Sequence, residues 1–305
     1  MTSVVVPASL ADRLETLLGT RVRTAVAAVG GHSNLVFEAT TAAGEPVVVK
    51  AANTAWKRAD IEREAAVLRA LDGDDTLPAP VLVTSSADAE WAMVVTRRID
   101  GSNGLSIVAD LRADEDLAVS VGRLMARVLR LVHHSSPGPL VGEDFDRAAQ
   151  ITGLDGPLRA SDAPSDVVEA LLPALGDAVH QQGMAFLHGD PGLHNVLWGP
   201  RTTALSLRGL LDWEMAGWGN PLSDLAWVWW TFTLRSLPRA CFDAFANEYG
   251  MVALQALGWS EQRVDALVRA QMAALLVRTE PGTAVREVWV ERVRSLGTLP
   301  PLDGS

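Results

Sequence analysis

The spacing of apolar residues changes once along the chain, near Gly101, from strand-like to helix-like. Before this point, β-branched runs alternate with Gly and Asp turns, which is typical of strands. We expect three strands in TAVAAVGG, NLVFEATT and PVVVKAA, a helix at about 56–71, and two further strands in LPAPVLVTSS and WAMVVTRRI. These elements predict a five-stranded antiparallel sheet with one helix.

After this change, apolar residues recur at helical spacing, as in the stripe Leu117, Val121, Leu124, Val128 and Leu131. We expect helices at 114–134, at 166–182 and over most of 221–296, with a buried helix among the last. The two patterns together predict an α+β fold. Residues 1–98 would form an amino-terminal lobe, and 99–305 a mostly helical carboxyl-terminal lobe.

Composition excludes several classes of protein and partner. Hydrophobic residues make up 48% and charged residues 21%, as in globular proteins. A formal charge of -11 argues against nucleic acid and anionic lipid and favours a neutral or cationic small molecule. The first twenty residues lack a signal-peptide pattern, and the apolar stretch 225–234 is too short to span a membrane. With Cys241 as the single cysteine, we expect a cytoplasmic protein. No obligate protein partner is evident from the sequence.

Two polar loops follow short apolar strands in the second half of the chain. Asp190 and Asn195 lie five residues apart between AFL and VLW, and Asp212 ends the strand in GLLDW. Asp190 can face a substrate hydroxyl, while Asn195 and Asp212 offer hard oxygen ligands for Mg²⁺ on nucleotide phosphates. Each residue taken alone is more often a turn or cap residue. Their joint order favours phosphoryl transfer.

The segments HGDPGLHN and LLDWE resemble the catalytic and metal-binding loops of the aminoglycoside phosphotransferase and choline kinase branch of the protein-kinase-like superfamily. The resemblance implies a bilobal fold with the nucleotide between the lobes. It implies that Asp190 is the catalytic base, that Asn195 and Asp212 bind Mg²⁺, and that His188 supports the loop. HGD in place of HRD, without an activation loop, points to small-molecule acceptors.

The resemblance also implies a nucleotide site in the amino-terminal lobe. Lys50 ends the strand VVVK, and Glu64, 14 residues later, aligns as its ion-pair partner in preference to Glu62. The turn VGGHSN resembles the GG-x-S-N turn whose backbone N–H groups approach phosphates. Its expected nucleotide-binding residues are Gly30, Gly31, Ser33 and Asn34.

Two further segments take their expected roles from this resemblance. Residues 94–98, with Val95 and Arg97, would offer backbone groups to the base of ATP or GTP. Asp224 would open a helix and brace the catalytic loop. Asn220 stands where the family often has Asp, which leaves open any contact that a carboxylate makes there.

Other candidates for chemistry favour structural roles. Trp227, Trp229 and Trp230 could stack on a substrate ring, but their helical spacing favours a place in the core. His133 and His134 lie at a helix end without any zinc-ligand spacing, so we expect a cap and surface histidines.

The function implied is transfer of the γ-phosphoryl group of ATP or GTP to a small-molecule hydroxyl. The leading acceptor is an antibiotic of the aminoglycoside type, with resistance as the effect. A metabolic kinase of choline, a sugar or homoserine is the alternative, and a non-catalytic nucleotide-binding scaffold is disfavoured by the intact site. Acidic residues of the carboxyl-terminal lobe could line a cleft for a polycation, although solvated helix faces explain them better: Asp243, Glu248, Asp265, Glu280, Glu287 and Glu291.

Overall fold

The computed structural model describes residues 8–27, 35–138, 140, 145–179, 184–200, 204–297 and 299–302. The chain divides into two compact units. The first comprises Met1–Asp100 and the short segment Gly209–Met215, and the second comprises Gly101–Arg208 and Ala216–Ser305. A segment from the second half of the sequence therefore belongs to the first unit.

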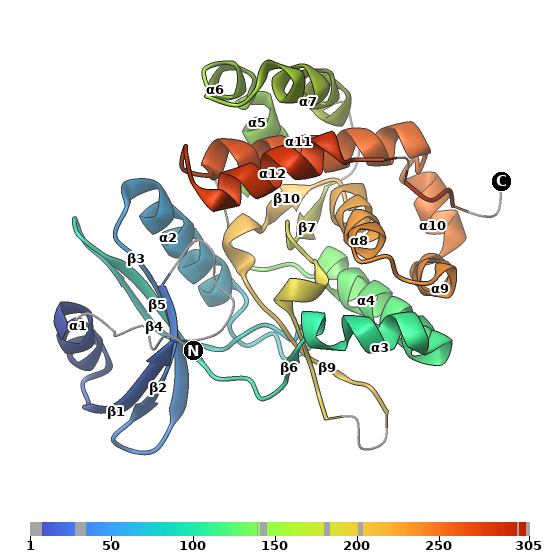
Figure 1. Ribbon diagram of the computed structural model, residues 1–305. Coiled ribbons are helices and arrows are strands. Elements are labelled where there is room, and N and C mark those ends of the chain that lie inside the picture. The colour runs from blue at the N-terminus through green and yellow to red at the C-terminus, as the bar shows by residue number, and fades with distance from the viewer. Residues whose placement is uncertain are drawn as a thin grey trace. The chain divides into compact units, whose positions relative to one another are not determined.

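A five-stranded sheet forms the centre of the first unit (Figure 1). Its strands are β1 (Val22–Ala27), β2 (Leu35–Thr41), β3 (Pro46–Ala52), β4 (Leu82–Ala87) and β5 (Ala92–Arg97). They are ordered β1-β2-β3-β5-β4, and each neighbouring pair is antiparallel. The predicted five-stranded antiparallel sheet is thus confirmed, with β3 in its middle.

Two α-helices accompany this sheet in the part of the first unit that the structure describes. α2 (Ala55–Ala70) lies where a helix was expected, but α1 (Ala8–Leu18) was not predicted, so the expectation of one helix was wrong. Leu10 and Leu14 lie one turn apart on α1 and are buried in the same cluster as Phe37 and Val49. The apolar face of α1 is stabilised by this contact with the sheet, which a short helix needs.

The second unit is mostly helical. Its helices are α3 (Val108–Ala113), α4 (Glu115–His134), α5 (Arg147–Thr152), α6 (Asp155–Arg159), α7 (Ser165–Val179), α8 (Leu222–Leu234), α9 (Arg239–Tyr249), α10 (Met251–Ala256), α11 (Glu261–Arg278) and α12 (Ala284–Arg294), with the 3₁₀ turns η1 (Gly104–Ile107) and η3 (Leu193–Asn195). α4, α7 and the helices from α8 onward match the predicted helical regions. α5 begins where the Asp146 side chain accepts hydrogen bonds from the backbone N–H groups of Ala148 and Ala149.

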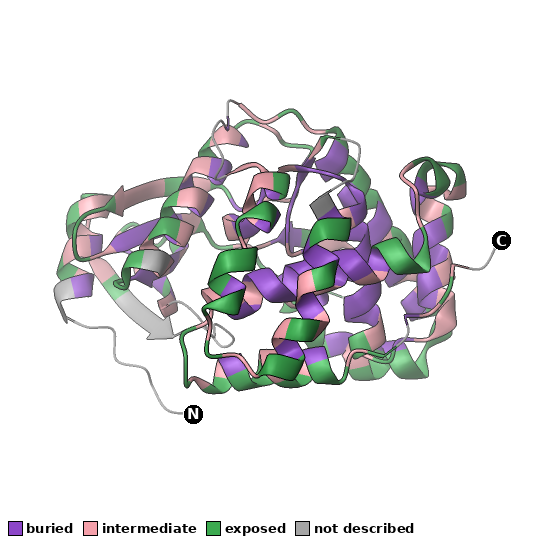
Figure 2. Cartoon of the chain, turned by 90° about the horizontal axis from the view of Figure 1, so that it is seen from above, coloured by how far each residue is buried: buried purple, intermediate pink, exposed green. Residues whose placement is uncertain are grey.

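α8 is the most apolar of these helices and belongs to the core. Leu225, Trp229 and Phe232 are completely buried, and buried residues occupy successive turns of the helix. Long buried stretches are also visible on other helices of this unit (Figure 2). The expected buried helix is confirmed. Within the described ranges, none of the helices combines the length and apolarity that crossing a bilayer requires.

Short strands carry the polar loops. β7 (Ala185–Leu187) pairs with β10 (Gly217–Gly219), and β6 (Ser102–Asn103) pairs with β8 (Val196–Trp198). The loop HGDPGLHN lies between β7 and β8. β9 (Leu207–Leu210) leads to Asp212 and to the 3₁₀ turn η4 (Trp213–Met215).

Candidate active site

Lys50 in the first unit is surrounded by carboxylates. Its Nζ donates to Glu64 Oε2 at 2.8 Å, to Asp212 Oδ1 at 2.5 Å and to Glu214 Oε2 at 2.6 Å. The structure therefore brings together Lys50 and Glu64, the expected ion pair, and adds two acidic groups from the segment Gly209–Met215. Glu214 was not singled out from the sequence, although it follows Asp212 by two residues in LLDWE.

The fold fixes each member of this cluster. Lys50 lies on the central strand β3, opposite Val36 of β2 and Val94 of β5. Glu64 is 5% exposed on the face of α2 that also buries Ile61, and its Oε1 accepts a hydrogen bond from the backbone N–H of Trp213 at 3.2 Å. α2 thus contacts η4 as well as the sheet.

Asp212 has a strained backbone. Its φ is 66°, in the left-handed region that residues other than glycine seldom adopt. Such conformations cost about 1–3 kcal/mol and cluster at functional sites. The residue in this conformation follows β9, and its carboxylate contacts Lys50.

Three carboxylates share one ammonium group in this cluster, which leaves an excess of negative charge. Burial disfavours the charge on Lys50, but Asp212, Glu214 and Glu64 outweigh it and raise the pKa of Lys50 well above its ordinary value. Burial, together with repulsion from Asp212 and Glu214, raises the pKa of Glu64 to about 7, although Lys50 opposes this shift.

The cluster has the chemistry of a divalent-cation site. Carboxylate oxygens of Glu64, Asp212 and Glu214 lie within 4.8 Å of one another. Mg²⁺ prefers such hard oxygen ligands. A divalent cation would also compensate the excess charge, so the residues present fit the expected ion.

In the second unit, Asp224 holds the backbone of the HGD loop. Asp224 is 1% exposed, and it accepts the N–H of His188 on Oδ2 at 2.8 Å and the N–H of Gly189 on Oδ1 at 2.9 Å. Gly189 has a φ of 85°, which glycine adopts without strain. His188 is fully buried, and its Nδ1 accepts the N–H of Asp190 at 3.2 Å. The ring of His188 and the carboxylate of Asp224 therefore both fix the backbone of the loop.

Three side chains orient the carboxylate of Asp190. Trp227 Nε1 donates to Oδ1 at 2.5 Å, while Asn195 Nδ2 and His194 Nε2 lie 3.2 Å and 3.1 Å from Oδ2. Burial disfavours ionisation of Asp190, but the charge and hydrogen bond of His194 and the hydrogen bond of Trp227 outweigh it and lower its pKa. Asp190 is therefore a carboxylate at neutral pH.

Asn195 presents an oxygen that suits a metal. Its amide nitrogen also donates to the backbone carbonyl of Asp190 at 2.9 Å, so the nitrogen faces the loop. Its Oδ1 forms no hydrogen bond with any residue that the structure describes. This carbonyl oxygen is the atom that the sequence assigns to Mg²⁺.

A buried histidine supports Asp224 from behind. His133 Nε2 lies 3.2 Å from Asp224 Oδ2, and His133 Nδ1 lies 2.9 Å from the hydroxyl of Tyr249. Burial disfavours the charge on Asp224, but the hydrogen bond and charge of His133 outweigh it and lower the pKa of Asp224. The expectation of a cap or surface residue at His133 was wrong, because α4 packs on α9 and covers this side chain, whereas His134 is exposed.

Further contacts hold the loop from other sides. Gln271 of α11 is 6% exposed and donates to the carbonyl of Gly189 at 2.9 Å. Asn103 donates to the carbonyl of His194 at 2.8 Å. At Gly104 an added Cβ would lie 2.1 Å from the carbonyl oxygen of Leu193, so only glycine permits this approach.

The remaining expected site residues lie in other places, and some of them are not described by the structure. Gly30, Gly31, Ser33 and Asn34 lie outside the described residues. Val95 is buried in β5, between β3 and β4. The N–H of Arg97 donates to the carbonyl of Val81 at 2.9 Å. In this part of the segment expected to bind the base, backbone groups therefore form hydrogen bonds within the sheet. Asn220 Oδ1 accepts the N–H of Leu222 at 2.8 Å, a capping contact at the start of α8.

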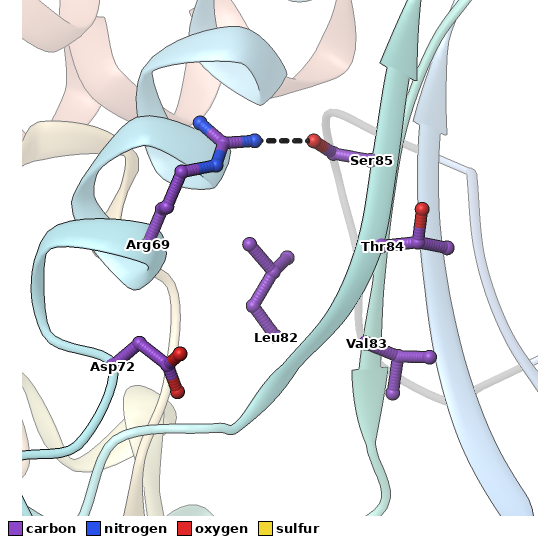
Figure 3. Close-up of a pocket in the computed structure, with 6 residues that line it drawn as sticks. All are labelled: Arg69, Asp72, Leu82, Val83, Thr84 and Ser85. Atoms are coloured by element: carbon purple, nitrogen blue, oxygen red, sulfur yellow. Dashed lines mark hydrogen bonds between the residues drawn. The ribbon is translucent and has the colours of Figure 1, made fainter.

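A shallow pocket of about 340 Å³ in the first unit contains none of these residues (Figure 3). It lies between α2 and β4, where Arg69 donates to the hydroxyl of Ser85 at 2.9 Å. Its lining residues are Arg69, Asp72, Leu82, Val83, Thr84 and Ser85. It offers no group for phosphoryl transfer.

A lysine–glutamate pair between β3 and α2, with an Asp and Asn loop in a helical unit, defines the protein-kinase-like class of fold. The chain belongs to the phosphotransferase enzyme family, whose profile matches residues 24–277. The family resemblance seen in HGDPGLHN and LLDWE is thereby confirmed.

Individual relatives support the same fold. Viomycin phosphotransferase of Streptomyces vinaceus is 39% identical over 66 residues, which span 22% of this chain and 23% of that protein. The crystal structure of a type VIII aminoglycoside-3'-phosphotransferase matches with a TM-score of 0.67 and 21% identity, covering 87% of this chain and 98% of that one. A Streptomyces rimosus aminoglycoside phosphotransferase in complex with ADP and streptomycin matches with a TM-score of 0.55 and 20% identity, covering 78% and 94%. The predicted kinase-like α+β fold is confirmed.

Proposed function

We propose that this protein transfers the γ-phosphoryl group of Mg²⁺-bound ATP or GTP to a hydroxyl group of a small molecule. The observation that carries the proposal is the cluster in which Lys50 binds both Glu64 and Asp212. In this fold class, that arrangement serves nucleotide phosphates. The ADP complex of the Streptomyces rimosus relative supports a nucleotide donor.

In the proposed mechanism, Lys50 binds the α- and β-phosphates and Glu64 keeps its ammonium group in place. Asp212 and Asn195 would hold Mg²⁺, with Glu214 as a further carboxylate of the cluster. When bound, the ion would neutralise negative charge on the phosphate oxygens. Positioning and charge neutralisation supply most of the rate enhancement in such transfers.

Asp190 would orient the acceptor. The acceptor oxygen forms a bond to the γ-phosphorus while the bond from that phosphorus to the β–γ bridging oxygen breaks, and the nucleoside diphosphate leaves. The hydroxyl proton passes to the Asp190 carboxylate. Because its pKa is lowered, Asp190 is a weak base and takes the proton late, as suits a loose transition state.

We propose an antibiotic as the acceptor and resistance as the effect. The support is that viomycin and aminoglycoside phosphotransferases are among the relatives. The cytoplasm, where nucleotide is available, is the proposed location.

Release of nucleoside diphosphate tests this function. Purified protein is incubated with Mg-ATP or Mg-GTP and with separate pools of aminoglycosides, macrolides, peptide antibiotics and metabolite alcohols. We expect one antibiotic pool to stimulate release, and Asp190→Asn to abolish the stimulation. Asp243→Asn, which changes a surface aspartate paired with Arg239, is the matched control. Failure of the wild-type protein to bind either nucleotide would contradict the proposal.

A further inference from the structure

A stack of tryptophan rings begins at the carboxylate of Asp190. Trp227 of α8 donates to Asp190 Oδ1 and lies with its ring centroid 4.4 Å from that of Trp230. Trp289 of α12 lies 6.2 Å from both rings. Trp227 and Trp230 are buried, whereas Trp289 is only half-buried, so the stack runs from the proposed base to the surface of the second unit.

Arg292 covers this stack. Its Cζ lies 4.4 Å from the ring centroid of Trp289 and 5.9 Å from that of Trp230, which is the range of cation–π contacts. Burial and the positive charge of Arg235, at the end of α8, lower the pKa of Arg292, while the charge of Asp190 raises it. Two guanidinium groups and the proposed base therefore lie within electrostatic range of one another.

Among the described side chains, no carboxylate forms an ion pair with Arg235 or Arg292. Half-buried cations held near each other repel, and an anion between or beside them would relieve the repulsion. A polycation would add to it.

The acidic residues of this unit do not offset the arginines. Asp243, Glu248 and Asp265 form ion pairs with Arg239, Arg127 and Arg269, respectively. At 100° per residue, Glu287 lies on the opposite side of α12 from Trp289 and Arg292, whereas Glu291 lies opposite Trp289 and about 100° from Arg292. Arg292 and Arg235 therefore place positive charge near Asp190 in a chain whose net charge is -11.

We propose that Trp289 and Arg292, with Trp230 and Arg235 behind them, bind the acceptor, and that the acceptor carries a planar ring and a negatively charged group. The inference rests on the proposed role of Asp190, because a base must lie within hydrogen-bond reach of the acceptor hydroxyl. The residues of the stack that begins at Asp190 would then contact the rest of the acceptor. Within the antibiotic phosphotransferases, this chemistry disfavours a polycationic aminoglycoside.

Three matched probes test the charge preference. The compounds para-(hydroxymethyl)benzoate, para-(hydroxymethyl)benzamide and para-(hydroxymethyl)benzylamine share a ring and a primary hydroxyl but are anionic, neutral and cationic. Binding to the full chain is measured by calorimetry or saturation-transfer NMR, which needs no turnover. We expect the benzoate to bind about tenfold more tightly than the benzylamine. Tightest binding of the benzylamine would overturn the inference.

Variants locate the preference. Arg292→Gln should weaken benzoate binding about tenfold and change benzamide binding little, because only the charged probe loses a partner. Arg294→Gln, on the same helix and paired with exposed Asp166, should leave the order of the probes unchanged. An unchanged preference in Arg292→Gln, or weakened ATP binding in place of weakened benzoate binding, would contradict the inference.

The same probes separate this inference from the proposed function. The Asp190→Asn variant should retain the binding order of the probes while losing phosphoryl transfer. If the order is found but the wild-type protein phosphorylates no acceptor, the proposed function fails and the anion-binding site stands. If transfer occurs but favours cationic acceptors, the function stands and the inference fails.

Discussion

The clusters around Lys50 and around Asp190 have opposite arrangements of charge. Around Lys50, three carboxylates share one cation, whereas around Asp190 three donors share one carboxylate. In the first cluster, burial and the neighbouring carboxylates raise the pKa of Glu64. The second is already oriented before any substrate arrives. In the proposed function, the cluster around Lys50 would bind a metal–nucleotide complex, and the cluster around Asp190 would present an oriented base.

The largest expected effect is on the oriented base. Asp190→Asn keeps the shape of the side chain but removes the proton acceptor, so we expect kcat to fall about 100-fold to 10,000-fold. Nucleotide binding should change little, since the cluster around Lys50 is intact. Single-turnover kinetics and nucleotide titrations measure the two effects. A comparable loss of nucleotide affinity would contradict the role of Asp190 as a base that acts on the acceptor.

The cluster around Lys50 should respond through stability. Lys50→Met leaves three buried or half-buried carboxylates without their cation, and we expect a loss of about 3–5 kcal/mol in the free energy of unfolding. Mg²⁺ should restore part of this loss if the carboxylates form its site. Urea unfolding with and without Mg²⁺ measures both effects. Lys57→Met, at a half-buried lysine of α2 outside the cluster, is the control, and an equal loss there would contradict the interpretation.

Trp227→Phe should weaken the orientation of Asp190. Phenylalanine keeps an aromatic ring at this position but removes the N–H that lowers the pKa of Asp190. We expect kcat to fall about tenfold, the worth of one hydrogen bond to a charged group, and the acid limb of the pH–rate profile to move to higher pH. Trp229→Phe makes the same change in the core but removes a donor to the carbonyl of Pro300, so it should leave the acid limb in place.

The smallest expected effect is the pH dependence of the crowded cluster. Glu64 has a pKa of about 7 in the folded protein against an ordinary value of 4.5, so the folded state binds the extra proton between these values. The free energy of unfolding should therefore fall as pH rises through this window. Glu64→Gln should remove that decline, and Glu62→Gln, an exposed change on the same helix, should retain it. Urea titrations across this range provide the slopes, and equal slopes in all three proteins would refute the assignment.

Sequence alone predicted what depends on local order. Alternating apolar residues gave the five strands, and the spacing of Asp190 and Asn195 placed both on one loop. The pairing of Lys50 with Glu64 followed from family order. Each of these features is set by residues close in sequence or by a motif that the family shares.

Residues that act through tertiary packing escaped prediction. The spacing of Trp227 indicates burial, but it does not reveal that the indole N–H points to Asp190, 37 residues away. The position of His133 at the end of a helix indicates exposure, but the packing of α4 on α9 buries it. Glu214 carried a signal, the acidic residue two positions after Asp212, that was not used. α1 was missed because its apolar stripe is short and is stabilised only by the sheet.

The segment Gly209–Met215 has a consequence for how such proteins can be recombined. Asp212 and Glu214 belong to the first unit, although more than a hundred residues of the second unit separate them from Asp100. A fragment cut after Asp100 would contain Lys50 and Glu64 but would lack two of the three acidic partners. Exchange of the first unit between relatives therefore requires one crossover after Asp100 and two more that flank Gly209–Met215. Modular swapping by a single junction would produce a chimera with a mismatched charge cluster.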